Sequence, residues 1–381
     1  MTDADILALR LSCHTTLPGH QYQTPAQTFA RMAAWCEQHQ VQHDSYGEGE
    51  LLQAFEQKVA TLLGMEAGLF CMTGTMTQVT ALRLACEERG SDLVALHASS
   101  HILQHEKSNY QLLRHFNALQ IGNPHRPWLL KDLQAVPEKL AAAQYELPMR
   151  EIGGQLPPWE ELEAIKSWCL ENEIHLHMDG ARLWEAAAGY GRSLADVARG
   201  FETAYVSFYK GIGGLGGAML LGKAEFIARA KVWMHRQGGS IFRRSPYVVS
   251  AAMQFDDRLA ALPACFARTQ WLFETLRDYP SFKTNPALPQ CNMLHLYLPV
   301  DRETAITIRN RIAQEHGIWL FNNAVHTALP GQCMFEWYVG DNLLAMDDAT
   351  VRRALSLLAD ALITAGLTTS TLTTATLITR A

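Results

Sequence analysis

Hydrophobic residues change repeatedly between a helical and a strand spacing from about residue 50 onward. Residues 50–63 place leucine, phenylalanine and valine on one helical stripe, and Gly64 follows where a helix can end. The short apolar run at 67–72 then has the length and composition of a buried strand. Because helical and strand patterns alternate, we expect βα units and a mainly parallel sheet.

The same alternation predicts the elements in the middle of the chain. Strands are expected at 92–97, 174–179, 204–210 and 218–222, and helices at 76–89, 159–172, 224–236 and 247–278. Pro157 and Pro158 precede one of these helices, which suits them because proline loses no hydrogen bond in a first helical turn. The pattern is that of an α/β domain with a doubly wound sheet.

The C-terminal part of the chain has a different pattern, typical of a small α+β domain. Strands are expected at 292–299 and 333–339, and helices at 303–316 and 348–364. Three prolines interrupt both periods within 278–290, so we place a boundary near Pro280. A chain of 381 residues also exceeds the ~250–300 residues of a single core. We expect an N-terminal segment at 1–48, a large domain at 49–280, a small C-terminal domain at 281–367 and a tail at 368–381.

Composition limits the kinds of partner. Charged residues make up 18% of the chain and the formal net charge is −6, so the broad positive field that attracts nucleic acid is lacking. No apolar run approaches the ~18 residues of a membrane span, and the first residues lack the pattern of a signal peptide. The 8 cysteines form no CxxC pair, which fits reduced thiols. We expect a soluble, cytoplasmic protein that binds neither nucleic acid nor membranes.

Two charged residues stand at the ends of expected buried strands. Asp179 ends the strand at 174–179, at the edge where open α/β sheets bind ligands, although an aspartate can also cap the following helix there. Lys210 ends the strand at 204–210, directly before the glycine-rich segment GIGGLGG. Such a pair suits pyridoxal phosphate, because the amine binds the cofactor's aldehyde and the carboxylate keeps the ring nitrogen protonated as part of an electron sink.

A cradle for the cofactor's phosphate is expected between a strand and a helix. Thr73, Gly74 and Thr75 separate the strand at 67–72 from the helix at 76–89. Backbone N–H groups and the helix dipole bind anions at such a position, and the threonine hydroxyls add donors. Turns of this kind with glycine also occur without a phosphate, so the interpretation depends on the other two signals.

Four segments together resemble a known family. They are SYGEGELLQAFEQKVATLLGMEAGLFCMTGTM, ASSHILQHE, IHLHMDGARLWEA and VSFYKG. From about residue 8 to 260 the chain resembles the threonine aldolase and β-eliminating lyase family, whose members are type I pyridoxal-phosphate enzymes of the aspartate-aminotransferase-like fold. The resemblance implies pyridoxal 5'-phosphate as cofactor, an amino acid as small-molecule substrate, and assembly as a homodimer or homotetramer.

The resemblance also implies roles at matching positions. Lys210 resembles the Schiff-base lysine, and Asp179 resembles the partner of the pyridine nitrogen. His101 matches a histidine that stacks on the cofactor ring and is a candidate acid or base. Arg182 matches an arginine that lies beside the cofactor and helps to hold the substrate carboxylate.

Further positions match the family's binding residues. Gly74 and Thr75 match phosphate contacts, and Arg243 is similar to an arginine that reaches a phosphate across a dimer interface. Ser12 lies where an N-terminal serine of the family approaches the substrate carboxylate.

The chain departs from the family at three positions. Tyr209 replaces the serine before the Schiff-base lysine, so one phosphate contact has to be rearranged. Met149, beside Arg150, stands where the family often has a histidine for the substrate hydroxyl. Glu336 lies near the place of an arginine that binds the substrate carboxylate, and a carboxylate there would repel that group.

Two other kinds of site are weighed and set aside. Two sets of residues have the spacing of metal ligands. One set has helical spacing and comprises His97, His101, His105 and Glu106; the other alternates along one strand and comprises His175, His177 and Asp179. We assign no metal, because Asp179 and His101 have roles in the cofactor site. The glycines at 211, 213 and 216 satisfy GxGxxG but lead into a strand instead of a helix, which argues against a dinucleotide site.

The sequence therefore predicts a lyase that cleaves a β-hydroxy-α-amino acid, L-threonine or L-allo-threonine, to glycine and an aldehyde. His101 would take the β-hydroxyl proton. The alternative within the same cofactor chemistry is β-elimination from another amino acid, with Lys210 removing the α-proton. A catalytically silent relative of the fold is the alternative of a different class, and it predicts no bound cofactor.

Overall fold

The computed structural model describes residues 1–378, and the chain divides into two compact units. The large unit comprises residues 23–262, and the small unit comprises residues 1–22 together with the chain from residue 263 on. The chain passes from one unit to the other inside helix α12 (Ser245–Leu276), whereas the sequence placed a boundary near Pro280. Pro263 lies within that helix, so the prolines at 280–289 follow the change of unit instead of marking it.

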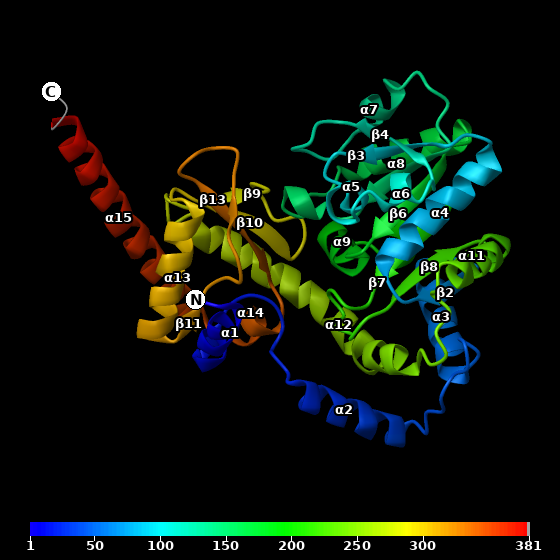
Figure 1. The fold of residues 1–381 in the computed structure, drawn as a ribbon, viewed down its shortest axis with the longest axis horizontal. Helices are drawn as coiled ribbons and strands as arrows, with labels where there is room; N and C mark the ends of the chain where they lie inside the picture. The colour runs from blue at the N-terminus through cyan, green and yellow to red at the C-terminus, as the bar shows by residue number, and fades with distance from the viewer. Residues whose placement is uncertain (379–381) are drawn as a thin grey trace. The chain divides into compact units, whose positions relative to one another are not determined.

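A seven-stranded sheet forms the centre of the large unit (Figure 1). Its strands in spatial order are β2 (Ala67–Cys71), β8 (Ala218–Gly222), β7 (Thr203–Ser207), β6 (His175–Gly180), β5 (Ala142–Glu146), β3 (Leu93–His97) and β4 (Asn117–Ile121). Only β8 among these strands runs antiparallel to its neighbours. The mainly parallel sheet expected from the sequence is confirmed.

Helices cover both faces of this sheet. One face packs on α3 (Glu50–Leu63), α8 (Trp159–Glu171), α9 (Leu183–Tyr190) and α10 (Leu194–Ala198), and the other packs on α4 (Gly74–Arg89) and α11 (Ala224–Arg236). Further helices of the unit are α2 (Pro25–Gln38), α5 (His101–His105), α6 (Asn109–Leu112), α7 (Leu130–Gln134) and the short η1 (Arg150–Ile152). The doubly wound arrangement follows from the alternating strand and helix patterns.

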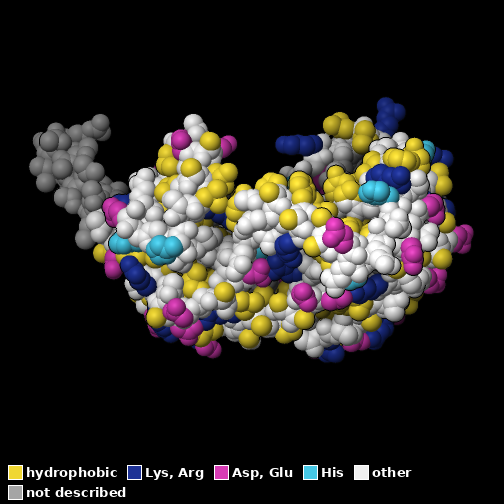
Figure 2. Space-filling view, turned by 90° about the horizontal axis from the view of Figure 1, so that it is seen from below, with side chains coloured by type: hydrophobic (Ala, Val, Ile, Leu, Met, Phe, Trp, Pro, Cys, Tyr) yellow, Lys and Arg dark blue, Asp and Glu magenta, His cyan; other side chains and the backbone are white. Residues whose placement is uncertain are grey.

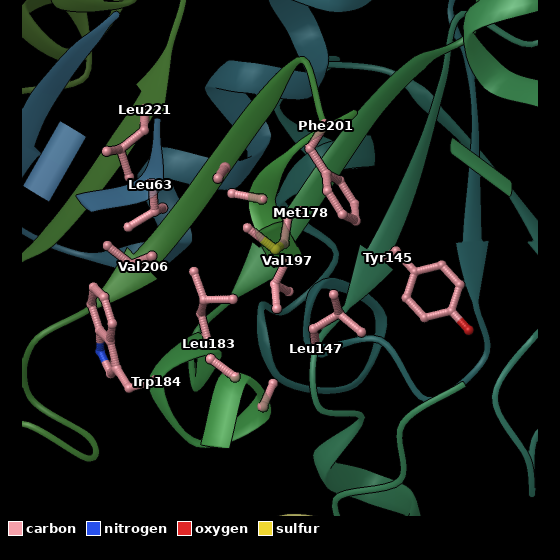
Figure 3. Packing of buried hydrophobic residues seen from close by; sticks show 14 of the residues in the cluster. Leu63, Tyr145, Leu147, Met178, Leu183, Trp184, Val197, Phe201, Val206 and Leu221 are labelled. Carbon is pink, nitrogen blue, oxygen red and sulfur yellow. The ribbon is translucent and has the colours of Figure 1, made fainter. Parts of the chain in front are cut away.

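Strand residues alternate between the two faces, and this alternation separates core from polar residues. Met178 and Val206 belong to the cluster under α3, α8 and α9, and Figure 3 shows both with Leu183 and Trp184 of helix α9. Tyr205 of β7, the neighbour of Val206, faces α4 instead. Because side chains alternate along a strand, Asp179 points to the same face as Tyr205.

Helix α4 begins two residues earlier than the apolar pattern indicated. Its first residue is Gly74, and the hydroxyl of Thr73 accepts a hydrogen bond from the N–H of Met76 at 3.4 Å. Thr73 is therefore the N-cap, because its oxygen satisfies one of the amides that a helix start leaves without an intrahelical partner. The helix ends as expected at Gly90, whose φ of 62° suits glycine.

The small unit contains a four-stranded antiparallel sheet with helices. The strands in order are β12 (Val325–His326), β13 (Cys333–Tyr338), β10 (Met293–Leu298) and β9 (Lys283–Asn285), and β1 (Thr15–Thr16) pairs separately with β11 (Ile318–Trp319). The helices are α1 (Asp3–Ser12), α13 (Arg302–His316), α14 (Asp341–Ala345) and α15 (Asp348–Ile378). Helix α15 thus continues through the first part of the expected tail, and residues 379–381 of that tail lie outside the described residues.

The surface and the thiols agree with the composition. Figure 2 shows Lys and Arg side chains interspersed with Asp and Glu over the visible face. Among the described residues the 8 cysteines form no disulfide bond, and six of them are buried. Among the residues that the structure describes with their side chains, no helix is both long and apolar enough to cross a membrane.

Replacing Phe208 by alanine should destabilise the large unit strongly. The buried ring of Phe208 lies 5.0 Å from the ring of Phe55 and 6.1 Å from that of Phe255, so its removal leaves a cavity. We expect the free energy of unfolding in urea to fall by about 3–5 kcal/mol. Leu170→Ala is the control, because Leu170 is 79% exposed and its loss should change that energy by less than about 0.5 kcal/mol. Equal effects of the two substitutions would contradict the packing described here.

Candidate active site

Five strands of the large unit end at the same edge of its sheet. Strands β2, β7, β6, β5 and β3 are mutually parallel, so their carboxyl ends lie together. The chain places Thr73, Lys210, Asp179, Glu146 and His101 at or just after these five ends. This is the edge at which open α/β sheets bind ligands.

Asp179 is a buried carboxylate on β6, only 1% exposed. Its Oδ1 accepts a hydrogen bond from the N–H of Ala181 at 3.1 Å, and its Oδ2 accepts a long one of 3.4 Å from Gln144. Helix α9 begins at Leu183 with Arg182 as its N-cap, so Asp179 does not cap that helix. The capping alternative is therefore wrong, and a ligand remains the better reason for burying this charge.

Lys210 lies three residues beyond the end of β7 and is partly buried. Burial lowers the pKa of its ammonium group, and the nearby Arg182 guanidinium lowers it further, against the opposing effect of Asp179 and Glu146. Within the described part of the chain the amine forms no hydrogen bond or ion pair. A lysine amine of lowered pKa that the described residues bind by no hydrogen bond or ion pair is suited to bind an aldehyde.

Glu146 is a site residue that the sequence analysis missed. It is 7% exposed and stands directly beside Asp179 in the register of β5 and β6. Burial, followed by the charge of Asp179, raises the pKa of its carboxyl to about 8. The strand that carries it was not predicted, because the segment 140–146, LAAAQYE, is rich in residues of high helix propensity.

His101 is oriented by a buried carboxylate. Its Nδ1 lies 3.0 Å from Oε1 of Glu106, whose other oxygen accepts a hydrogen bond of 2.9 Å from Asn109. A carboxylate at Nδ1 favours a proton on that nitrogen and leaves Nε2 as the acceptor. The ring centre of His105 lies 5.1 Å from that of His101, and the Nε2 of His105 lies 2.9 Å from Glu151.

The histidines do not gather around a metal position. His97 contacts Ser99 and the carbonyl of Asn123, away from His101 and His105. In the strand motif, His175 and His177 share one partner, since each has a ring nitrogen 2.8 Å from the hydroxyl of Thr203. No group of three or more potential ligands is placed to hold a metal ion among residues 1–365, whose side chains the structure describes.

The N-terminus of α4 has unpaired amides where the sequence predicts a phosphate cradle, and the binding of phosphate there stays a prediction. The N–H groups of Gly74 and Thr75 make no hydrogen bond to any part of the chain that the structure describes. A Cβ on Gly74 would lie 2.2 Å from the hydroxyl oxygen of Tyr205, so only glycine fits there. Tyr205 is a second residue that the sequence analysis missed, and burial holds the pKa of its hydroxyl well above the usual value.

The structure leaves other predicted roles as predictions. Arg243 donates hydrogen bonds to the carbonyl of Asp44 and to Ser45, so its contact with a phosphate across an interface stays a prediction. Ser12 belongs to the small unit, where its hydroxyl donates to the carbonyl of Leu9 at 2.8 Å.

The positions that depart from the family pattern have clear surroundings. Met149 is fully buried in the main core cluster of the large unit, so it contributes no polar group at the site. Tyr209 is 40% exposed beside Lys210. Glu336 lies on β13 of the small unit opposite His295, with 3.9 Å between the carboxylate and the ring nitrogen.

Buried polar atoms without partners favour a polar ligand at this edge. Among the described residues, Oε2 of Glu146, Oε1 of Gln144 and the hydroxyl of Ser207 make no hydrogen bond. All three side chains belong to the face of the sheet that carries Asp179. Since unpaired buried polar atoms are costly, these residues fit a group such as pyridoxal phosphate, which offers a charged phosphate and ring heteroatoms.

Comparisons with known proteins agree with this geometry. Residues 24–298 match the model of the family described as beta-eliminating lyase. The low-specificity L-threonine aldolase of Eremothecium gossypii is 31% identical over 210 residues, which are 52% of this chain and 53% of that protein. The corresponding enzyme of Saccharomyces cerevisiae is 32% identical over 203 residues, 51% of this chain and 52% of that one. The chain thus spans about half the length of the curated relatives it matches.

Solved structures match over nearly the whole chain. A protein of Exiguobacterium sp. 255-15, named for aromatic amino acid beta-eliminating lyase or threonine aldolase, has a TM-score of 0.87 and 33% identity, covering 93% of this chain and 99% of its own. A protein of Listeria monocytogenes EGD-E named for L-allo-threonine aldolase has a TM-score of 0.85 and 32% identity, covering 94% and 98%. Serine palmitoyltransferase of Sphingomonas wittichii, at 16% identity and a TM-score of 0.69 over 92% and 88%, shares the fold alone. The expected type I fold of pyridoxal-phosphate enzymes is confirmed.

Gly74→Ala should weaken the binding of pyridoxal phosphate by about tenfold or more. The added Cβ meets the Tyr205 hydroxyl, and relieving such overpacking by moving the cradle costs ~1–3 kcal/mol. The measurement is titration of the cofactor-free protein by fluorescence. Gly90→Ala, at the other end of α4, is the control. No atom lies within 4 Å of its added Cβ, so this substitution acts only through the strain of an alanine at a φ of +62°. It should lower stability and leave the affinity unchanged; equal affinity losses in both variants would count against the cradle.

Proposed function

Because the chain belongs to the beta-eliminating lyase family, we propose that it is a pyridoxal-phosphate-dependent lyase that cleaves the Cα–Cβ bond of a β-hydroxy-α-amino acid. L-Threonine or L-allo-threonine would give glycine and acetaldehyde. The observation that carries the proposal is the pairing of buried Asp179 with the Lys210 amine of lowered pKa at one edge of the sheet. The names of the relatives as L-threonine aldolases support this choice of substrate.

Five residues would hold the cofactor in this proposal. The free N–H groups of Gly74 and Thr75 bind the phosphate at the start of α4, with the hydroxyl of Thr73 beside them. Asp179 binds the ring nitrogen, and Lys210 binds the aldehyde. When bound, pyridoxal phosphate supplies an electron sink that stabilises negative charge at Cα of the substrate.

Two further side chains act on the substrate. Arg182 places a positive charge near Lys210, where it can bind the substrate carboxylate. His101, with Nδ1 held by Glu106, offers Nε2 to take the proton of the β-hydroxyl as the Cα–Cβ bond breaks. The proton leaves the oxygen, the aldehyde C=O forms, and the electron pair of the broken bond stays with Cα.

One observation favours β-elimination as the second candidate function. Met149 is buried in the core, so the site has no base at the position where relatives often place a histidine for the substrate hydroxyl. With Lys210 removing the α-proton, L-serine would lose its hydroxyl and give pyruvate and ammonia. This alternative uses the same cofactor residues and differs only in the bond that breaks.

We also propose that the enzyme acts in the cytoplasm as a homodimer or homotetramer on small amino acids. The formal net charge of −6 and the interspersed charges of the face in Figure 2 support the expectation that the chain does not bind nucleic acid. The position of Arg243 in the family resemblance supports the assembly.

A product assay separates the two reactions. The purified protein is incubated with pyridoxal phosphate and L-threonine or L-allo-threonine, and acetaldehyde is measured by coupled reduction with NADH. We expect acetaldehyde and glycine in equal amounts. Pyruvate and ammonia from L-serine, with no aldehyde from either threonine isomer, would show β-elimination instead. A spectral change on adding glycine checks independently that amino acids bind.

Lys210→Ala should abolish covalent attachment of the cofactor while the protein stays folded. Borohydride treatment of the loaded wild type, followed by peptide mass spectrometry, should place the cofactor on Lys210. Lys166 is the internal control, because burial also lowers its pKa but its amine donates to Glu163 at 2.8 Å and to the carbonyl of Val197 at 3.1 Å. Attachment at Lys166, or a visible absorbance band that persists in Lys210→Ala, would overturn the choice of lysine.

A further inference from the structure

We propose that Glu146 is a further residue of the cofactor site, which keeps its proton beside the ionised Asp179 and donates a hydrogen bond from Oε2 to the bound pyridoxal phosphate. This inference rests on the proposed function, because it requires the cofactor to bind at this edge of the sheet. Neither the notable motifs of the sequence nor the names of the relatives point to Glu146.

The position of Glu146 is set by strand register. Glu146 of β5 is the direct partner of Asp179 on β6, so the two carboxyl groups project side by side from the same face of the sheet. Gln144, two residues earlier on that face, donates to Gln78 of α4 at 2.6 Å, which shows that the face is covered by α4. Glu146 is thus inside the site and not at its rim.

The two oxygens of Glu146 have different surroundings. Oε1 accepts a hydrogen bond of 3.0 Å from the N–H of Arg150. Oε2 is buried and has no hydrogen-bond partner anywhere in the described residues. A buried polar atom left without a partner is costly, so a ligand that accepts or donates at Oε2 would gain from the contact.

Of the two neighbouring carboxyl groups, Asp179 is better suited to carry the negative charge. Two like charges side by side in a buried site oppose each other's ionisation. Among the described residues, Asp179 accepts hydrogen bonds from the N–H of Ala181 and the amide of Gln144, whereas Glu146 accepts one, from the N–H of Arg150. Donors that bind a carboxylate favour its charged form.

The charged groups around Glu146 lead to the same assignment. Asp179 on β6 opposes its ionisation, while Lys210 after β7, Arg182 before α9 and the backbone N–H of Arg150 in η1 favour it. Burial and Asp179 outweigh these groups and raise the pKa of the Glu146 carboxyl to about 8. Near neutral pH the group is therefore a neutral acid whose O–H can donate.

A neutral Glu146 also keeps the Lys210 amine reactive. A second negative charge beside Lys210 would favour the ammonium form, which cannot attack an aldehyde. Burial is the main cause of the lowered pKa of Lys210. When Glu146 is protonated, Asp179 is the single anion of the two carboxyl groups, so this lowering is preserved. Glu146 acts in this respect as a positioning residue, through the charge of the site.

The test compares cofactor affinity between wild type and two variants from pH 6 to pH 9.5. Glu146→Gln keeps a neutral donor, so its affinity should lie within about threefold of wild type at pH 6.5. Above about pH 8 the wild type should weaken relative to this variant, because its carboxyl then loses the proton. Glu146→Leu has no donor and should bind about tenfold more weakly than Glu146→Gln at every pH. Glu138→Gln, at an exposed glutamate, should follow the wild type throughout.

Stability of the cofactor-free protein gives an independent readout. The folded pKa of Glu146 lies above the unfolded value of about 4.5, so the folded state binds an extra proton between these two values. Its contribution to stability is fully present below about pH 4.5 and is lost as the pH rises toward about 8. As the pH rises over that range, the midpoint temperature of thermal unfolding should therefore fall more in the wild type than in Glu146→Gln. Glu138→Gln should have the same midpoint temperature as the wild type at each pH.

The outcomes separate this inference from the proposed function. If wild type binds no pyridoxal phosphate, the proposed function fails. If it binds the cofactor, but the affinity ratio to Glu146→Gln is constant with pH and the stability difference is also constant, then Glu146 is not protonated and the inference fails alone. A Glu146→Gln variant that binds more than tenfold more weakly at pH 6.5 would likewise overturn it, because the charge and not the donor would then be required.

Discussion

The burial of the Asp179 carboxylate at the carboxyl edge of the sheet is the constraint around which the large unit's polar residues are arranged. An ion in that position is costly unless other groups compensate it. The chain supplies an amide N–H from Ala181 and a long contact from Gln144, and it places the Lys210 amine and the Arg182 guanidinium nearby. These groups hold the charge without neutralising it, which leaves Asp179 able to bind a protonated ring nitrogen.

Strand alternation lets one sheet serve as both core and site. On one face, residues such as Met178 and Val206 pack against α3, α8 and α9, and the aromatic ring of Phe208 joins the same cluster. On the other face, β5, β6 and β7 present glutamine, glutamate, aspartate, tyrosine and serine toward α4. The close approach of Gly74 to Tyr205 brings the start of α4 onto this polar face. The phosphate cradle and the ring-binding carboxylate therefore depend on the same packing contact.

One basic residue and one acidic residue, both shifted toward their neutral forms, account for the chemistry proposed at this edge. Burial lowers the pKa of Lys210 and raises that of Glu146, so both groups are shifted toward their neutral forms. Neutral groups are the ones that can attack an aldehyde or donate a hydrogen bond without adding charge. Asp179 is left as the anion between them. This division of charge is a property of three neighbouring strands and not of any single motif.

The sequence by itself determined the parallel sheet, most of its helices and the chemical identity of the central pair. Alternating periods identified β2, β3, β6, β7 and β8 within a few residues, since each is a short apolar run bounded by glycine or polar residues. Asp179 alone could have been a helix cap, and it was recognisable as a site residue because Lys210, a second charge at the end of an apolar strand, suits the same cofactor. The phosphate turn was recognisable for its glycine between threonines.

Only the tertiary structure decided which residues complete the site. Strand β5 is built from residues with helix propensity, and it becomes a strand because it is buried between β3 and β6, so Glu146 was invisible until that pairing was known. Tyr205 looked like any aromatic strand residue until its hydroxyl was found against Gly74. Met149 was recognised as a departure from the family pattern, and the structure shows that its side chain is buried in the core. In each case the sequence fixes the residue's chemistry, but strand register and helix packing decide which face it occupies, and those are set by contacts between segments far apart in the chain.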